Sequence, residues 1–128
     1  MFTKPLDLRH RRIAKYAKGE VLDIGYADHP NRFLKGDVWG VDLVASIKPP
    51  NYKKILKRDA SEVSMLFEKK QFDTIVAAEI IEHLENPASF LRGVKEILKD
   101  SGRLIISTPN DLPNFKKRKS DFYQKCNR

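Results

Sequence analysis

Five short apolar runs, separated by longer and more polar segments, dominate the pattern of the 128-residue chain. They lie at 20–25, 38–44, 55–60, 72–79 and 103–108. Continuous runs of valine, isoleucine and leucine are typical of strands buried on both faces of a parallel sheet, and the run at 55–60 is the weakest of the five. Because helix-like segments alternate with these runs, the pattern predicts an α/β fold with an open, mostly parallel sheet of about five strands.

The first half of the chain contains two short helical patterns. Residues 8–18 space their apolar side chains as an amphipathic helix does, and Gly19 ends the pattern. Asp28 can cap a second, brief helix that has Pro30 near its first position and that Gly36 closes. Both helices are therefore expected to flank the strand at 20–25.

The second half carries the strongest helical signal. Asn86 supplies an N-cap, a proline follows in the first turn, and apolar residues form one stripe over 87–98. Residues 61–68 are expected to form a further short helix. The proline-broken segment 48–54 is expected to be a loop, and 100–102 a turn before the fifth strand.

Four residues with chemical potential fall where predicted strands end. These are Gly25, Asp42, Asp59 and Glu79. In open α/β sheets the ligand lies in a crevice beyond the carboxyl ends of the strands. The sequence therefore predicts that these residues share one binding site.

Net charge adds an expectation about partners. The chain carries a formal charge of +8, and much of it is concentrated in 1–18 and 113–128. Basic ends suit an anionic partner such as nucleic acid, although solvated termini are the more ordinary explanation. The single cysteine, Cys126, excludes an intrachain disulfide, and no apolar leader or membrane-length segment is evident. We therefore expect one cytoplasmic domain over 1–128 with no membrane association.

The spacing between Gly25 and Asp42 favours an adenosyl cofactor. Asp42 follows Gly25 by seventeen positions, at the end of the second strand. A carboxylate at this place can accept hydrogen bonds from both ribose hydroxyls. The spacing fits a nicotinamide dinucleotide and S-adenosylmethionine equally well.

The loop after the first strand separates the two cofactors. In a Gly-x-Gly-x-Gly loop that begins at Gly25, Ala27 and His29 occupy the second and third glycine positions. A dinucleotide needs close backbone approach to its pyrophosphate there, and Asp28 adds negative charge where the phosphate would lie. S-adenosylmethionine has no phosphate and carries an ammonium and a sulfonium, so acidic residues near the loop favour it.

A purely structural explanation of these side chains stays open. Asp23 and Asp28 can cap local backbone groups. His29 can line the loop or serve a local turn. His10 has no evident partner in the sequence, and we expect it on the surface.

The motifs resemble those of a known family, the class I S-adenosylmethionine-dependent methyltransferases. The resemblance rests on "VLDIGYA", "WGVDLV", "RDASE" and "FDTIVAAEIIEHLENPASFLRGVKEILKDSGRLIISTPN", over about 20–110. The last stretch is similar to the branch that contains quinone-biosynthesis O-methyltransferases and small-RNA 2′-O-methyltransferases. The resemblance implies a Rossmann-like three-layer α/β/α fold and methyl transfer in the EC 2.1.1 class. O-methylation of an unidentified acceptor is favoured.

The resemblance also implies roles for residues near the first two strands. Asp23 and Gly25 would lie beside the methionine part of S-adenosylmethionine, and Asp42 would bind its ribose. Tyr26 and Ala27 belong to the same cofactor-binding loop.

The remaining cofactor contacts follow from the later motifs. Asp59 and Ala60 would meet the adenine, whose exocyclic amine suits a carboxylate acceptor. Ala78 and Glu79 would close over the cofactor at the end of the fourth strand. Leu43 completes the expected cofactor-binding set.

The C-terminus departs from the family pattern. Only 18 residues follow Asn110, where family members typically add a helix and an antiparallel strand pair. The fold is therefore expected to lack the usual C-terminal strand pair, which would leave the strand at 103–108 as an open apolar edge. Either the tail at 121–126 covers this edge, or a second subunit pairs with it, or the chain is part of a longer protein, and a homodimer is slightly favoured.

The segment "EIIEH" at 79–83 has two interpretations. Glu79, Glu82 and His83 could offer Mg²⁺ or Mn²⁺ a mixed oxygen and nitrogen site, as in some of the resembled enzymes. No further histidine follows His83 to complete such a site, so the interpretation without a metal is favoured. In that case Glu79 faces the cofactor, Glu82 stays solvated or caps the next turn, and His83 packs. Glu82 and His83 are the candidates for a catalytic base.

A function from a different class is the main alternative. The altered glycine loop and the short C-terminus fit a non-catalytic binding module with a methyltransferase-like fold, whose basic ends contact nucleic acid or protein. The acidic residues Asp42 and Glu79 at the strand ends favour the enzyme.

Overall fold

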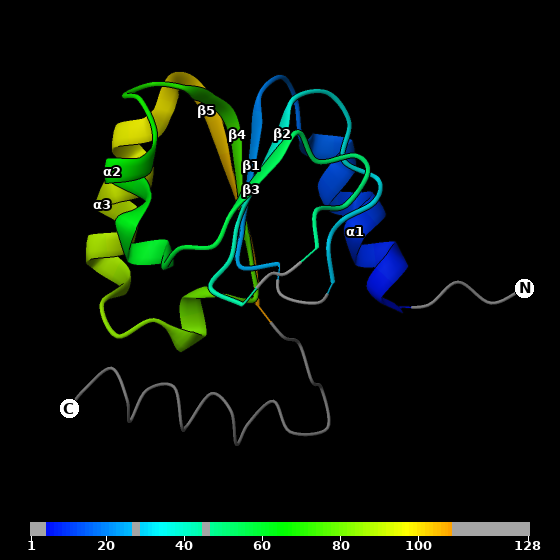
Figure 1. The fold of residues 1–128 in the computed structure, drawn as a ribbon, viewed down its shortest axis with the longest axis horizontal. Coiled ribbons are helices and arrows are strands. Elements are labelled where there is room, and N and C mark those ends of the chain that lie inside the picture. The colour runs from blue at the N-terminus through cyan, green and yellow to red at the C-terminus, as the bar shows by residue number, and fades with distance from the viewer. Residues whose placement is uncertain (1–4, 27–28, 45–46, 109–128) are drawn as a thin grey trace, which may run out of the picture.

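The computed structural model describes residues 5–26, 29–44 and 47–108. All five strands are parallel and form one sheet in the order β3-β2-β1-β4-β5. In Figure 1 the helix α1 covers one face of this sheet, and α2 and α3 cover the other. The predicted three-layer α/β/α architecture is therefore confirmed.

The predicted strands all form, with small differences at their ends. The bounds are β1 Val21–Ile24, β2 Val38–Val41, β3 Lys54–Leu56, β4 Phe72–Ala78 and β5 Leu98–Ser107. The weakest apolar run gives the shortest strand, β3, which forms an edge of the sheet. The central strand β1 is buried along its whole length, including Asp23 between its apolar residues.

Most of the predicted helices form as well. They are α1 Pro5–Tyr16, the 3₁₀ turn η1 Ala60–Glu62, α2 Val63–Leu66, the 3₁₀ turn η2 Ile81–His83 and α3 Pro87–Ile97. The α3 helix begins as expected, because the Asn86 side chain accepts a hydrogen bond from the Ser89 backbone N–H at 3.0 Å.

The brief helix expected over 28–36 is a wrong prediction for the part that the structure describes. Residues 29–36 form a turn and extended loop, while Asp28 lies outside the described residues. Asn31 and Leu34 are both buried in this loop, so its apolar contact with the sheet is made without a helix.

The strand β5 starts earlier than predicted. It begins at Leu98, directly after α3, and its pairing with β4 shifts so that residues 99–102 lie opposite the single residue Asp73. The expected turn at 100–102 is thus an irregularity within the strand. In the described part of the chain β5 pairs with β4 alone, and the tail at 121–126 that we expected to cover this edge lies outside the described residues.

The core lies in two layers, one on each face of the sheet. Successive side chains of a strand point to opposite faces. Leu22 and Ile24 of β1 accordingly join α3 on one face, and Val21 joins Ile13 of α1 on the other. Asp23 alternates with Leu22 and Ile24, so its side chain lies on the α1 face.

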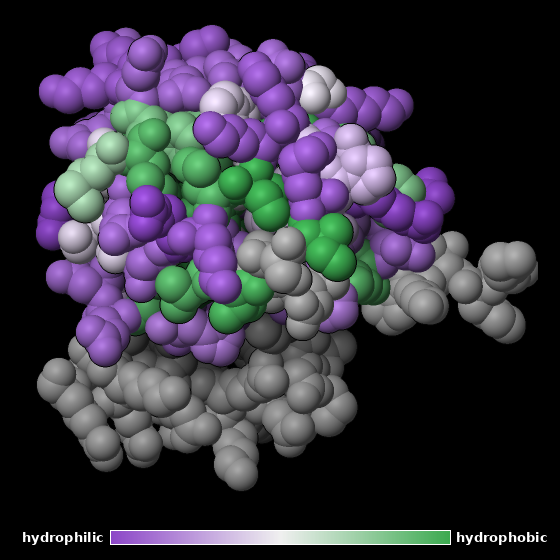
Figure 2. Space-filling model, in the orientation of Figure 1, coloured by the Kyte–Doolittle hydropathy of each residue, from purple (hydrophilic) through white to green (hydrophobic). Residues whose placement is uncertain are grey.

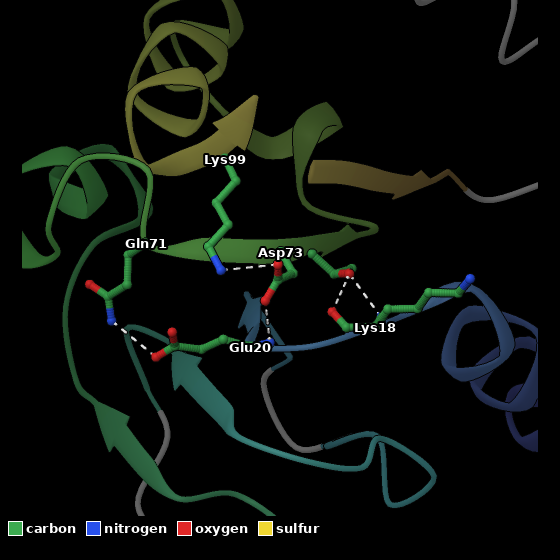
Figure 3. Close-up of polar contacts among 6 residues, drawn as sticks. Lys18, Glu20, Gln71, Asp73 and Lys99 are labelled. Atoms are coloured by element: carbon green, nitrogen blue, oxygen red, sulfur yellow. Dashed lines mark hydrogen bonds and ion pairs between the residues drawn. The ribbon is translucent and has the colours of Figure 1, made fainter. Parts of the chain in front are cut away.

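A polar cluster holds β1 to β4 at their amino ends (Figure 3). The Asp73 carboxylate accepts hydrogen bonds from the Glu20 backbone N–H at 2.8 Å and from Lys99 Nζ at 3.1 Å. These contacts lower the pKa of Asp73, the backbone hydrogen bond most of all. Thr74 and Gln71 add hydrogen bonds to Lys18 and Glu20 beside it. The cluster fixes the end of the sheet opposite the strand ends that carry the predicted site.

No helix in the described ranges is both long and apolar enough to span a membrane.

Candidate cofactor site

A cavity of about 650 Å³ lies at the carboxyl ends of β1, β2 and β4. The strand order reverses between β1 and β4, and such a switch point is where open α/β sheets bind ligands. The cavity is lined by nearly all predicted cofactor residues, namely Asp23, Gly25, Tyr26, Asp42, Leu43, Asp59, Ala60, Ala78 and Glu79. Ala27 lies outside the described residues. The grouping predicted from the strand ends is therefore present in the fold.

Gly25 and Asp42 lie side by side at the floor of the cavity. The Gly25 backbone N–H donates to the Val41 carbonyl at 2.8 Å, which continues the pairing of β1 with β2. Gly25 has a left-handed φ of +73°, and a Cβ there would lie 2.6 Å from Ile80 Cδ1. A larger residue is thus excluded on two grounds.

Asp42 is held in a fixed orientation. It is buried, and its Oδ1 accepts a hydrogen bond from the Val44 backbone N–H at 2.8 Å. Its own backbone N–H donates to the Leu56 carbonyl at 3.1 Å. A carboxylate that is fixed in this way is preorganised for a ligand with paired hydroxyl groups.

Asp23 is a buried carboxyl group at the inner end of the cavity. It is 3% exposed, and the Tyr52 hydroxyl donates a hydrogen bond to its Oδ2. The pKa of Asp23 is raised to about 7, mainly by burial and in smaller part by the nearby Asp42, while the Tyr52 hydrogen bond acts in the opposite direction. Asp23 is therefore ionised in only part of the molecules at neutral pH.

Glu79 closes the far side of the cavity in a strained backbone conformation. Its φ is +56°, in the left-handed region that a residue with a Cβ rarely adopts. Its backbone N–H donates to the Ser107 carbonyl at 2.7 Å, and its side chain forms an ion pair with Arg9. Strain of this kind is often found at binding sites, where the surrounding structure maintains it.

The helix α1 supplies cavity residues that the sequence analysis missed. Arg9, His10 and Ile13 line the cavity from this helix. Our expectation that His10 lies on the surface is wrong, because it is 7% exposed. Burial, and next the charge of Arg9, lower the pKa of His10, so its imidazole is neutral at pH 7. The spacing of Arg9 and Ile13 on one helical face was the signal that could have revealed them.

The outer rim of the cavity is more exposed and partly apolar. Leu43 and Val44 are 59% and 62% exposed. Figure 2 shows hydrophobic side chains gathered within an otherwise hydrophilic surface on the face it presents. Exposed apolar side chains at a cavity rim can pack against a flat aromatic group.

Asp59 at the cavity is also exposed. It accepts a hydrogen bond from the Ser61 backbone N–H at 2.9 Å, so it also caps η1.

The two candidates for a catalytic base lie differently from each other. His83 lines the cavity, whereas Glu82 is not among the lining residues. The His83 side chain is 76% exposed, so the expectation that it packs is wrong. Its Nε2 lies 3.7 Å from Glu82 Oε1. Across the described ranges, no group of three or more His, Cys, Asp or Glu side chains is arranged to hold a metal ion.

The cavity lacks the usual device for binding a pyrophosphate, as far as the structure describes it. A dinucleotide fold presents the amino end of a helix to the phosphates directly after the first strand. Between β1 and β2, the described residues 25–26 and 29–37 contain no helix. The four carboxyl groups of the lining (Asp23, Asp42, Asp59 and Glu79) outnumber its two arginines (Arg9 and Arg58), so the cavity fits a cationic ligand better than an anionic one.

Comparison with known proteins agrees with this geometry. The chain belongs to the methyltransferase domain family, whose model matches residues 1–124. The ubiquinone biosynthesis O-methyltransferase of Ruegeria sp. (strain TM1040) is 29% identical over 111 residues, covering 78% of this chain and 45% of that protein. The mitochondrial ubiquinone biosynthesis O-methyltransferase of Rattus norvegicus is 32% identical over 106 residues, covering 71% of this chain and 31% of that protein.

A solved structure supports the same family. The crystal structure of a SAM-dependent methyltransferase from Archaeoglobus fulgidus superposes with a TM-score of 0.61 at 25% identity. The match covers 82% of this chain and 52% of that one. The chain spans less than half the length of the two curated relatives.

Proposed function

We propose that this chain binds S-adenosylmethionine in the cavity and transfers its methyl group to an acceptor, with oxygen as the favoured nucleophile. The observation that carries the proposal is the convergence of the acidic residues Asp23, Asp42 and Glu79 on one cavity, next to a loop whose described residues contain no phosphate-binding helix. A cavity of about 650 Å³ is also within the usual range for a ligand of this size.

Three parts of the cofactor have a matching group in this proposal. Asp42 accepts hydrogen bonds from the ribose hydroxyls. Asp23 faces the ammonium of the methionine part, near the backbone of Gly25. Asp59 and Ala60 contact the adenine from the rim of the cavity.

The chemistry makes few demands on the protein. S-adenosylmethionine supplies a methyl carbon that the sulfonium already activates, so an acceptor can displace S-adenosylhomocysteine in line. The chain must align the acceptor and exclude water. His83 at the cavity and Glu82 beside it are the groups proposed to accept the acceptor's proton. The choice of oxygen rests on the two O-methyltransferases to which the chain is similar.

The test is calorimetric titration of S-adenosylhomocysteine into the wild type and into Asp42→Ala. The substitution removes a charged acceptor of two hydroxyl groups, and we expect a loss of about 2–3 kcal/mol, or about 30- to 150-fold in Kd. Asp37→Ala is the matched control. It changes an exposed aspartate just before the other end of the same strand, and we expect no change in Kd.

The outcomes are separable. Wild-type binding that a folded Asp42→Ala variant retains in full would refute the ribose site. No binding to the wild type would refute the cofactor and favour the non-catalytic module.

A further inference from the structure

Two tyrosines cover β2 on the face of the sheet that α1 also covers. The rings of Tyr26 and Tyr52 contact each other edge to face, with centroids 5.3 Å apart. Both cover Gly40, since a Cβ at that residue would lie 2.6 Å from Tyr26 Cε1 and 3.0 Å from Tyr52 Cδ2. Helices commonly cover this face of an α/β sheet. Here aromatic rings from two loops take part of that role.

The Tyr52 hydroxyl joins two loops to the first strand. It accepts a hydrogen bond from the Asn31 backbone N–H at 2.9 Å and donates to the Asp23 carboxylate. Asn31 is held in turn, because its Nδ2 donates to the His10 carbonyl at 3.0 Å and its carbonyl accepts from Asn51 Nδ2 at 2.9 Å. Hydrogen bonds in such a chain polarise and strengthen one another.

The direction of the hydrogen bond between Tyr52 and Asp23 is fixed whenever Asp23 is ionised. Burial and the neighbouring Asp23 raise the pKa of Tyr52, so its phenol stays protonated and can only donate to the carboxylate. An ionised carboxylate accepts this hydrogen bond more strongly than a neutral one. The Tyr52 hydroxyl therefore stabilises the charged form of Asp23 against the effect of burial.

We propose that Tyr52 is a positioning residue of the cofactor site, whose hydroxyl holds the Asp23 carboxylate charged and oriented so that it can receive the ammonium group of the ligand. This inference rests on the proposed function. In this proposal Tyr52 and Asn31 compensate for the altered glycine loop, because they fix both the loop after β1 and the Asp23 carboxylate. A tighter glycine turn followed by a helix would otherwise provide that support.

Other charged or titratable groups line the same cavity as Asp23 and are identical in all the proteins compared. They come from every element around the cavity, namely Arg9 and His10 of α1, His29, Asp42, Arg58, Asp59, Glu79 and His83. A comparison of variants at each pH cancels their titration, as well as that of the ligand's own amino group.

The experiment measures the Kd of S-adenosylhomocysteine from pH 5.5 to 9 in the wild type and in Tyr52→Phe. This substitution keeps the ring and its edge contact with Tyr26 but removes the donor. We expect the Kd ratio of variant to wild type to be about fivefold at pH 7 and to approach one at pH 9, because the midpoint of Asp23 ionisation moves up by about one pH unit. A purely structural role would give a ratio that is the same at every pH.

Two further variants sharpen the test. Tyr26→Phe removes the neighbouring hydroxyl, which has no hydrogen-bond partner among the described residues. A hydroxyl that does not affect Asp23 changes the affinity by one factor at all pH values, so we expect a flat ratio. Asp23→Asn removes the titrating group, and its ratio should increase as the pH rises through 7.

The possible results separate the role of Tyr52 from the proposed binding of S-adenosylmethionine. A flat ratio for a folded Tyr52→Phe variant would overturn the role of Tyr52. If that variant does not fold, a flat ratio for Asp23→Asn would overturn the proposal instead. Absence of wild-type binding at every pH would refute the proposed function itself.

Discussion

Replacing Asp23 by asparagine should stabilise the ligand-free protein, and more so as the pH rises. Asp23 has an ordinary pKa of 3.8 in the unfolded chain and about 7 in the folded protein. Between these values the folded protein binds more protons than the unfolded chain, so the free energy of unfolding decreases as the pH increases. The folded protein is most stable while Asp23 is neutral, so this contribution to the free energy of unfolding is fully present below about pH 4. It is lost as the pH rises to about 7. Asparagine resembles the neutral carboxyl in shape and keeps an acceptor for Tyr52.

The magnitude follows from the difference between the two pKa values. One unit corresponds to about 1.4 kcal/mol, so a difference of about three units amounts to about 4 kcal/mol. No large reduction for solvent is needed, because Asp23 is 3% exposed. We expect the free energy of unfolding of Asp23→Asn to exceed that of the wild type by about 1 to 2 kcal/mol at pH 5 and by about 4 kcal/mol at pH 8.5.

Urea unfolding at these two pH values measures the effect. Asp73→Asn is the matched control, since the hydrogen bonds of Asp73 lower its pKa. The stability from Asp73 is present above its unfolded pKa and is lost only as the pH falls through its lower folded value. This control should therefore be destabilised by about 1 kcal/mol or less, and equally at both pH values. An advantage of Asp23→Asn that is constant or shrinks between pH 5 and pH 8.5 would refute the reasoning.

Two further pairs of variants test backbone conformation, one pair at Glu79 in the cavity and the other at two glycines outside it. Glu79→Gly and Glu79→Ala both lose the ion pair to Arg9, but only glycine relieves the strain of the left-handed φ. We therefore expect the glycine variant to be more stable than the alanine variant by about 0.5–1 kcal/mol in urea unfolding. Equal stability of the two variants would contradict the strain at Glu79. Gly19→Ala should destabilise by at least about 1 kcal/mol, because Gly19 has a φ of +67° and a Cβ would lie 2.2 Å from Asp73 Oδ2. In Gly93→Ala, the new Cβ in α3 makes only ordinary contacts, so this variant should be more stable than the wild type by about 0.5–1 kcal/mol. If Gly19→Ala and Gly93→Ala change the stability in the same direction, the different backbone roles of the two glycines are refuted.

The sheet could be predicted from the sequence because strands that are buried on both faces are rich in apolar residues. That signal is strong for β1, β2 and β4, in which most residues are buried. It weakens at the edge, where β3 has an exposed and two half-buried residues. The strand ends then located the acidic residues of the site, since parallel strands bring their carboxyl ends to one edge.

The parts of the site that were missed depend on tertiary contacts. Tyr52 lies in a proline-broken loop, 29 positions from Asp23, and no local pattern relates the two. The loop at 29–36 carries helix-capping residues, but the buried contacts of Asn31 and Leu34 favour an extended path. His10 looked like one more polar residue of a basic segment until α1 packed over the cavity.

Parallel calorimetric titration of the wild-type protein with S-adenosylmethionine, S-adenosylhomocysteine and NAD tests the central claim most directly. The acidic cavity, with no helix among the described residues between β1 and β2, predicts that both sulfur compounds bind at one site per chain and that NAD does not. Binding of NAD in preference to S-adenosylhomocysteine, or binding of none of the three, would contradict it.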